Sequence, residues 1–135
     1  MKTSPELDIL YLVCADLSDD ALNGLSLACW PGDMPQQYGQ VLAHSLLFVS
    51  ARVGDLLVGF VNMAWDGGEH GFLLDTRVHP DFRHRGIGTE LVKRAVSEAG
   101  TRNLKWVHVD FEPHLKKFYA DCGFVDTEAG LVRLR

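Results

Sequence analysis

The chain has 135 residues, of which 47% are hydrophobic, so it can bury one sizeable core and leaves little room for a second domain. No run reaches the roughly 20 apolar residues of a membrane-spanning helix, and Met1–Leu7 lacks the apolar centre of a secretory signal. The net charge of −5 and three widely spaced cysteines argue against a nucleic-acid-binding protein and against a disulfide framework. We therefore expect one domain, residues 1–135, in the reducing cytoplasm, with no metal site and with its cysteines at least partly buried.

The first third of the chain predicts one strand and two helices. Leu7–Ala15 is apolar and rich in Leu, Ile and Val, as in a buried strand. Ser18 is a good helix cap, and the two acids after it favour a helix that ends before Pro31. Asp33, with a proline two residues later, predicts a second helix that runs to about His44.

Three strands joined by tight turns follow these helices. Leu46–Val53 and Leu56–Ala64 flank the turn Gly54-Asp55, and the turn at residues 66–68 leads into a third strand, His70–Val78. Strands connected in this way form an antiparallel block.

The last part of the chain alternates helices and strands. A loop, His79–Arg85, opens a helix over Gly86–Ala99 that buries one apolar face and ends at Gly100. The remaining predicted elements are a strand Leu104–Phe111, a helix Pro113–Asp121, and a closing hairpin of Phe124-Val125 with Leu131–Leu134 around Gly130. The strand–helix–strand unit at 70–111 implies a parallel pair with a right-handed crossover, so we predict a mixed sheet with helices packed against it.

Charge is unevenly distributed along the chain. Residues 1–76 carry a net charge of −8, residues 77–94 a net charge of +3, and residues 95–135 are balanced. A basic segment in an acidic chain suits a small polyanionic ligand better than a nucleic-acid backbone.

The segment Arg83–Thr89 lies where a predicted strand ends and a predicted helix begins. Amides in the first turn of a helix have no internal partner, and the helix dipole is positive there, so a phosphate can bind to them. Glycines at 86 and 88 keep side chains away from such an anion, Arg83 and Arg85 add charge, and Thr89 adds a hydroxyl.

Two familiar phosphate loops are excluded by spacing. A dinucleotide fingerprint requires a glycine three residues after Gly88, where the sequence has Leu91. A Walker loop requires Gly-Lys-Ser/Thr, whereas Gly88 is followed by Thr89 and Glu90. A nucleotide-binding domain is therefore disfavoured.

Three motifs stand in the second half of the chain: Val78-His-Pro, then Arg83-x-x-Gly86-x-Gly88, and near the C-terminus Phe118-Tyr-x-x-x-Gly-Phe124. Together they resemble the GNAT family of CoA-dependent N-acetyltransferases. The first matches the end of the family's fourth strand, and the second matches its pyrophosphate signature. The third is similar to its C-terminal Tyr-x-x-x-Gly-Phe motif, at the expected separation. The resemblance implies an α+β fold layered α/β/α, with a mixed, mostly antiparallel sheet and a splayed parallel central pair. It also implies acetyl-CoA as co-substrate.

By this resemblance, the backbone of Thr76, Arg77 and Val78 pairs with the pantetheine arm, and the Val78 amide polarises the thioester carbonyl. The resemblance also implies that Tyr119 is the general acid that protonates the leaving thiolate. The pyrophosphate is held by the whole loop: Arg83, His84, Arg85, Gly86, Ile87, Gly88 and Thr89.

The group that takes the proton from the amine stays open among Asp75, His108, Asp110, Glu112 and ordered water. Alternation on the strand puts Asp75 and Arg77 on one face and Thr76 on the other. Many family members have Asn at the position of Glu112, where it helps to hold CoA, so that contact is in doubt here.

The resemblance implies acetyl transfer to a primary amine by direct attack, with a catalytically inactive CoA-binding sensor or partner module as the alternative. Small amines, polyamines, amino acids, antibiotics and protein or peptide amines all remain possible acceptors, and a homodimer is possible. No partnership with nucleic acid or a membrane is expected. We interpret the aromatic residues as core rather than as an acceptor pocket, namely Trp30, Trp65, Trp106, Phe48, Phe60 and Phe72.

Overall fold

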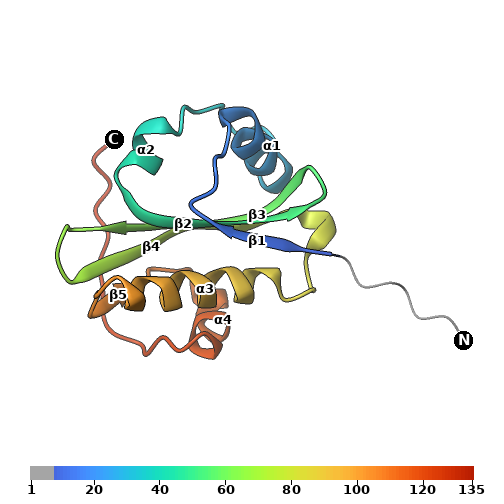
Figure 1. The fold of residues 1–135 in the computed structure, drawn as a ribbon. Coiled ribbons are helices and arrows are strands. Elements are labelled where there is room, and N and C mark those ends of the chain that lie inside the picture. The colour runs from blue at the N-terminus through green and yellow to red at the C-terminus, as the bar shows by residue number, and fades with distance from the viewer. Residues whose placement is uncertain (1–7) are drawn as a thin grey trace, which may run out of the picture.

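The computed structural model describes residues 8–135, and the segment Met1–Leu7, where the first strand was predicted to begin, lies outside the described residues. Two helices cover each face of one sheet (Figure 1). The strands, in sheet order, are β1 (Leu10–Val13), β2 (Ser45–Val53), β3 (Leu56–Trp65), β4 (His70–Val78) and β5 (Trp106–His108). The helices are α1 (Asp19–Cys29), α2 (Gly39–Ala43), α3 (Ile87–Thr101) and α4 (Lys116–Asp121), with 3₁₀ turns at Pro80–Phe82 and Pro113–Leu115.

The sheet is mixed, which confirms the predicted fold class. Strands β1 to β4 pair antiparallel, and β4 pairs with β5 in parallel through the crossover helix α3. Because β5 is the last strand of the described sheet, this parallel pair lies at its edge, and the predicted central position is wrong for the described residues.

Helix α3 forms the core on one face of the sheet. Its apolar stripe Ile87, Leu91, Val92 and Ala95 is at most 1% exposed and packs on the inward residues of β2 and β3. Helix and sheet approach closely at Gly59, where a Cβ would lie 2.8 Å from a Leu91 side-chain carbon. This contact packs the first turns of α3 directly on β3, at the residue that pairs with Val78.

Helices α1 and α2 cover the other face. Ser18 caps α1 by accepting a hydrogen bond from the Ala21 amide, as predicted. The predicted second helix is wrong over residues 33–38, which form a loop, because α1 side chains bind the loop's main chain: Asn23 pairs with Gln36, and Asp19 accepts from the Tyr38 amide.

Several predicted boundaries near the C-terminus are also wrong. Helix α3 runs through Gly100 and is followed by a left-handed residue at Asn103. A strand was predicted over residues 104–111, but β5 has only three residues. It pairs with β4 only at residues 70–72, and beyond that point the two strands are no longer hydrogen-bonded.

The predicted closing hairpin does not form, and no strand follows α4 in the described chain. Val125, Leu131, Val132 and Leu134 are between 81% and 89% exposed. An isolated two-stranded hairpin is marginal in water, and the segment after α4 pairs with no strand of the described sheet.

Aromatic and cysteine placement departs from the prediction in part. Phe60 is 1% exposed, but Trp30, Trp65 and Trp106 are 39–57% exposed because each lies at the end of a helix or strand, and Phe72 is 38% exposed. The three cysteines are free thiols, with Cys14 exposed and the other two half-buried. Among the described residues, no helix is both long and apolar enough to cross a bilayer.

Candidate active site

The second half of β4 has a free main-chain edge. Strand β5 pairs only with residues 70–72 of β4, so residues 73–78 have β3 on one side and no described strand on the other. The His79 amide donates to the Val58 carbonyl of β3, so the Val78 amide, one residue earlier, points into the opening. This opening can take an extended ligand that hydrogen-bonds like a strand.

A β-bulge changes the faces of β4 just before the opening. Leu74 lies opposite Asn62 and Arg77 lies opposite Phe60, so β4 has one residue more than β3 between these pairs. Asp75 lies within this bulge with φ 61°, a left-handed conformation that is rare outside glycine. As a result, Thr76 and Val78 face the α3 side, whereas Arg77 faces α1.

The loop after β4 leads into the N-terminus of α3, where several main-chain amides are free. His84 and Gly86 have φ values of 62° and 78°, and the Glu90 amide donates to the Gly86 carbonyl to close the first turn of α3. The amides of Ile87, Gly88 and Thr89 precede that bond and therefore have no partner within the helix.

Beside these amides is a pocket of about 230 Å³ between the loop, the end of β4 and α4. Every loop residue from Arg83 to Thr89 except Arg85 lines it, together with Val78, Phe82 and Phe118. A Cβ at Gly88 would lie 3.4 Å from the Phe118 ring, so a larger residue would narrow the pocket. Arg85 instead stacks its guanidinium over Phe82 at 5.9 Å.

Tyr119 lies at the other side of the opening. It is 6% exposed and contacts three rings, Phe111, Phe118 and Phe124. Burial raises the pKa of its phenol, a hydrogen bond with Thr76 lowers it, and the nearby charge of Asp110 raises it again. Tyr119 therefore keeps its proton at neutral pH and lies beside Thr76 in the open segment of β4.

On the α1 side, the guanidinium of Arg77 is enclosed by α1 and the following loop. It donates to the hydroxyls of Ser26 and Tyr38, and it lies 5.4 Å from the ring centre of Trp30. Its carboxylate partner is Asp75, at 3.7 Å. Arg77 was predicted to bind the cofactor through its backbone. Its side chain lies on the face of the sheet that α1 covers.

The other proton-acceptor candidates occupy different surroundings. His108 is hydrogen-bonded to His70 at 2.8 Å and stacks on Phe72. Glu112 lies 3.5 Å from His114, and both side chains are largely exposed. Asp110 is exposed and lies near enough to Tyr119 to influence its phenol.

Cys29 is part of the site although neither motif contains it. Its Sγ donates to the Val78 carbonyl at 3.3 Å, and Arg83 and Arg77 are both close to the thiol. Burial raises the pKa of the Cys29 thiol, and the two arginines partly oppose that shift. No local sequence signal marks Cys29, Ser26 or Tyr38, because each reaches the site through the packing of α1.

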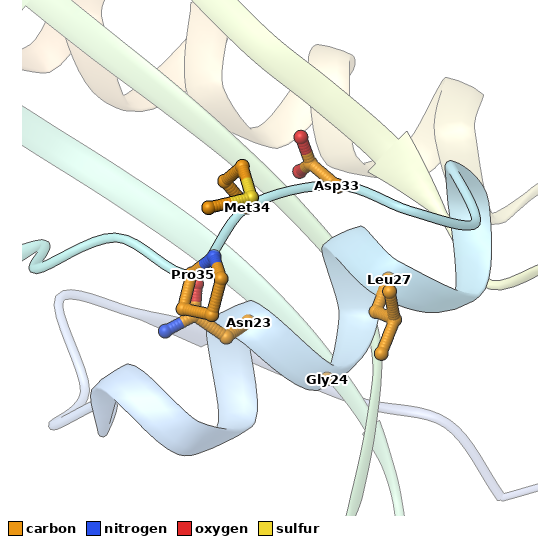
Figure 2. A pocket seen from close by; sticks show the side chains of 6 residues that line it. All are labelled: Asn23, Gly24, Leu27, Asp33, Met34 and Pro35. Atoms are coloured by element: carbon orange, nitrogen blue, oxygen red, sulfur yellow. The ribbon is translucent and has the colours of Figure 1, made fainter.

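A second, smaller pocket lies between α1 and the loop that follows it (Figure 2). It measures about 140 Å³ and is lined by Asn23, Gly24, Leu27, Asp33, Met34 and Pro35. Met34 and Leu27 are 76% and 52% exposed, so this loop presents apolar side chains at the rim of the α1 side.

Comparison with known proteins agrees with this arrangement. The model of the acetyltransferase (GNAT) family matches residues 15–124. A mycothiol acetyltransferase of Mycolicibacterium vanbaalenii is 32% identical over 98 residues, which is 73% of this chain and 32% of that protein. The chain therefore spans about a third of the length of this curated relative.

Solved structures resemble the chain over nearly its whole length. A putative acetyltransferase from Deinococcus radiodurans has a TM-score of 0.81 and 26% identity, covering 99% of this chain and 94% of the other. The aminoglycoside N-acetyltransferase AAC(6')-Iy in complex with CoA has a TM-score of 0.75 and 18% identity, covering 99% of both chains, and shows the shared fold.

Proposed function

Because the chain belongs to the acetyltransferase (GNAT) family, we propose that it transfers an acetyl group from acetyl-CoA to a primary amine by direct attack. The observation that carries the proposal is the free edge of β4 between the helix mouth of α3 and the phenol of Tyr119. In this proposal the start of α3 binds phosphate, the free edge of β4 pairs with an extended ligand, and Tyr119 donates a proton. The three lie in that order along one opening.

Acetyl-CoA lies with its pyrophosphate on the loop Arg83–Thr89 and its pantetheine arm along residues 76–78. The free amides at the start of α3 and the charge of Arg83 suit a diphosphate. The Val78 amide points into the opening and supplies a hydrogen-bond donor for the thioester carbonyl, whose oxygen gains negative charge during attack.

Tyr119 acts as the general acid. Expulsion of the CoA thiolate is easier when a proton donor is within reach, and such groups contribute about 10²–10⁴-fold to rate. The raised pKa of its buried phenol keeps Tyr119 protonated throughout the neutral range, as this role requires.

The acceptor is a small-molecule or peptide amine that approaches from the α1 side. Asp75 carries an exposed carboxylate there, and the buried Asn62 has an Oδ1 atom without a partner among the described residues. Both oxygens accept hydrogen bonds from an ammonium group. The relatives named for mycothiol and aminoglycosides agree with a small polar acceptor.

We extend the proposal to compartment and assembly. The free thiols suit the reducing cytoplasm. The exposed apolar side chains of residues 131–134 and the free outer edge of β5 favour pairing with a second copy of the chain.

The proposal is tested by two measurements on the same preparation. Calorimetry with CoA measures binding, and thiol release from acetyl-CoA measures turnover with glucosamine, spermidine, tyramine and a lysine-containing peptide. We expect micromolar binding and thiol release that depends on at least one amine. Binding without amine-dependent release would indicate a CoA-binding module, and no binding would reject the proposal entirely.

A further inference from the structure

The side chain of Arg77 is a buried cation. It is 8% exposed and lies between the rings of Trp30, at 5.4 Å, and Phe60, at 5.8 Å. The Ser26 and Tyr38 hydroxyls that accept from it are themselves buried. Neutral hydroxyls and rings do not cancel a buried charge, so Arg77 requires a carboxylate partner.

Asp75 is that partner, the one carboxylate within 4 Å of Arg77 in the part of the chain that the structure describes. The guanidinium approaches it at two places. Its Nη2 lies 3.7 Å from the carboxylate oxygen Oδ1, and its Nε donates to the main-chain carbonyl of Asp75 at 3.2 Å. Arg77 therefore holds the backbone of Asp75 by a hydrogen bond and attracts its carboxylate through a longer ion pair.

This attachment matters because Asp75 occupies an uncommon backbone conformation. Its φ of 61° lies in the left-handed region, which residues other than glycine seldom adopt. The bulge turns the next residue, Thr76, toward Tyr119 and leaves the Asp75 carboxylate 47% exposed on the α1 side. A carboxylate and a phenol thus flank the same point of β4 from opposite faces of the sheet.

We infer that Asp75 takes the proton from the acceptor ammonium and that Arg77 is the residue that positions it. This inference rests on the proposed function. His108 is hydrogen-bonded to His70, and Glu112 lies beside His114 on the surface, whereas Asp75 is held at the start of the open edge. Asp110 lies near the phenol of Tyr119 and lacks such an anchor among the described ion pairs.

The proton balance is complete with these groups. The ammonium gives one proton to the Asp75 carboxylate, and the freed nitrogen lone pair forms the C–N bond as the C–S bond breaks. The departing sulfur takes the proton of Tyr119, and the second nitrogen proton, lost as the amide forms, restores the phenol. Asp75 then releases its proton to water.

The test is a double-mutant cycle with Asp75→Asn and Arg77→Met, assayed with whichever of glucosamine, spermidine or tyramine supports thiol release. We expect Asp75→Asn to lower kcat/KM for the amine about 100-fold and Arg77→Met about 10-fold or more. The double variant should be no worse than Asp75→Asn, because Arg77 acts through Asp75. If the fold-losses of the two single variants multiply in the double variant, Arg77 only holds α1 in place. That result would overturn the positioning of Asp75 by Arg77.

Further variants separate this role from simple folding defects. Arg94→Met is the matched control, since Arg94 also pairs with a carboxylate, Glu90, but on the exposed face of α3. If Arg77→Met does not fold, Tyr38→Phe replaces it in the test. This change removes one acceptor of the Arg77 guanidinium and keeps the ring, so it should lower activity mildly. A variant Asp75→Asn that retains activity within threefold would overturn the assignment of the base.

Calorimetry and NMR distinguish failure of this inference from failure of the proposed function. Asp75→Asn leaves the main chain of β4 and the Arg83–Thr89 loop in place, so it should bind CoA within about twofold of the wild type. The Arg77 Nη–H resonances should shift in Asp75→Asn, because Nη2 faces the carboxylate, and not in Asp110→Asn. An unshifted resonance rejects the Arg77–Asp75 contact, whereas a wild-type chain without CoA affinity rejects the proposed function.

Discussion

The Sγ of Cys29 donates a 3.3 Å hydrogen bond to the main-chain carbonyl of Val78, so the end of α1 contacts β4 at its open edge. The carbonyl and amide of one strand residue point the same way, so this thiol lies on the side where we place pantetheine. Bound acetyl-CoA should therefore cover Cys29.

Protection from alkylation measures this coverage. We expect saturating acetyl-CoA to slow the reaction of Cys29 with iodoacetamide at least 10-fold, read by peptide mass spectrometry. Because burial raises the pKa of the thiol, the unprotected reaction should be slow near pH 7 and should accelerate as pH rises. Cys14 is exposed and serves as the internal control. Equal alkylation of Cys29 with and without acetyl-CoA would contradict the proposed path of pantetheine.

Arg83 should contribute to binding through the pyrophosphate alone. Loss of one charge-assisted hydrogen bond costs about 1.5–3 kcal/mol, so Arg83→Ala should weaken CoA binding about 10- to 150-fold. Pantetheine lacks the pyrophosphate, and its weaker affinity should not change. Calorimetry with both ligands checks this, and Arg102→Ala, a substitution at the far end of α3, is the control. A variant that loses affinity for both ligands would indicate a distorted loop instead.

The conformation of the segment Arg83–Thr89 could be predicted from the sequence, because neighbours in the chain determine it. Glycine 86, with φ 78°, and the amides after it are set by neighbours in the chain. The boundaries of the three strands from 45 to 78 were also predicted within one residue, since turns and alternation mark them.

The α1 face could not be predicted in the same way. Asn23 and Asp19 hold the loop at 33–38 by contacts across 13 and 19 residues of sequence, which override its local helix signals. The environment of Arg77 depends on Ser26, 51 residues away, and on a bulge that no single residue marks. The tryptophans were wrongly predicted to lie in the core, because the sequence pattern does not show that each of them lies at the end of a helix or strand.

Tyr119→Phe separates proton donation from packing. The ring contacts with Phe111, Phe118 and Phe124 survive this change, so the free energy of unfolding at pH 7 should change by less than about 1.5 kcal/mol. Activity should fall about 10²–10⁴-fold with CoA affinity retained. Thiol-release kinetics and calorimetry check both. Unchanged turnover would show that another group protonates the thiolate.

The raised pKa of Tyr119 also predicts how stability depends on pH. The folded state favours the protonated phenol, so its contribution to stability is present below the ordinary pKa of 10.0 and is lost as pH rises through the higher folded-state value. Urea unfolding of the wild type should show stability falling above about pH 10. The Tyr119→Phe variant should lose less stability over that interval, and identical slopes would mean that other groups govern the alkaline transition.

The exposed C-terminal segment predicts the oligomeric state. Leu131 and Leu134 are 84% and 87% exposed, and full burial of one such side chain is worth about 1.5–3 kcal/mol. Pairing of this segment with the outer edge of β5 in a second copy would bury these side chains and satisfy the free edge. Light scattering should therefore give about twice the chain mass of 15.0 kDa at micromolar concentration.

Charged substitutions identify the segment responsible. Leu131→Lys with Leu134→Lys should yield a folded monomer, because lysine resists burial against a strand edge. Arg133→Lys, between them, keeps the charge and should remain dimeric. The substituted residues belong to none of the helices and strands in the described part of the chain. Circular dichroism of the double variant should therefore match that of the wild type. A wild-type monomer at 100 µM, or a dimer that persists in the double lysine variant, would reject pairing through the C-terminal segment.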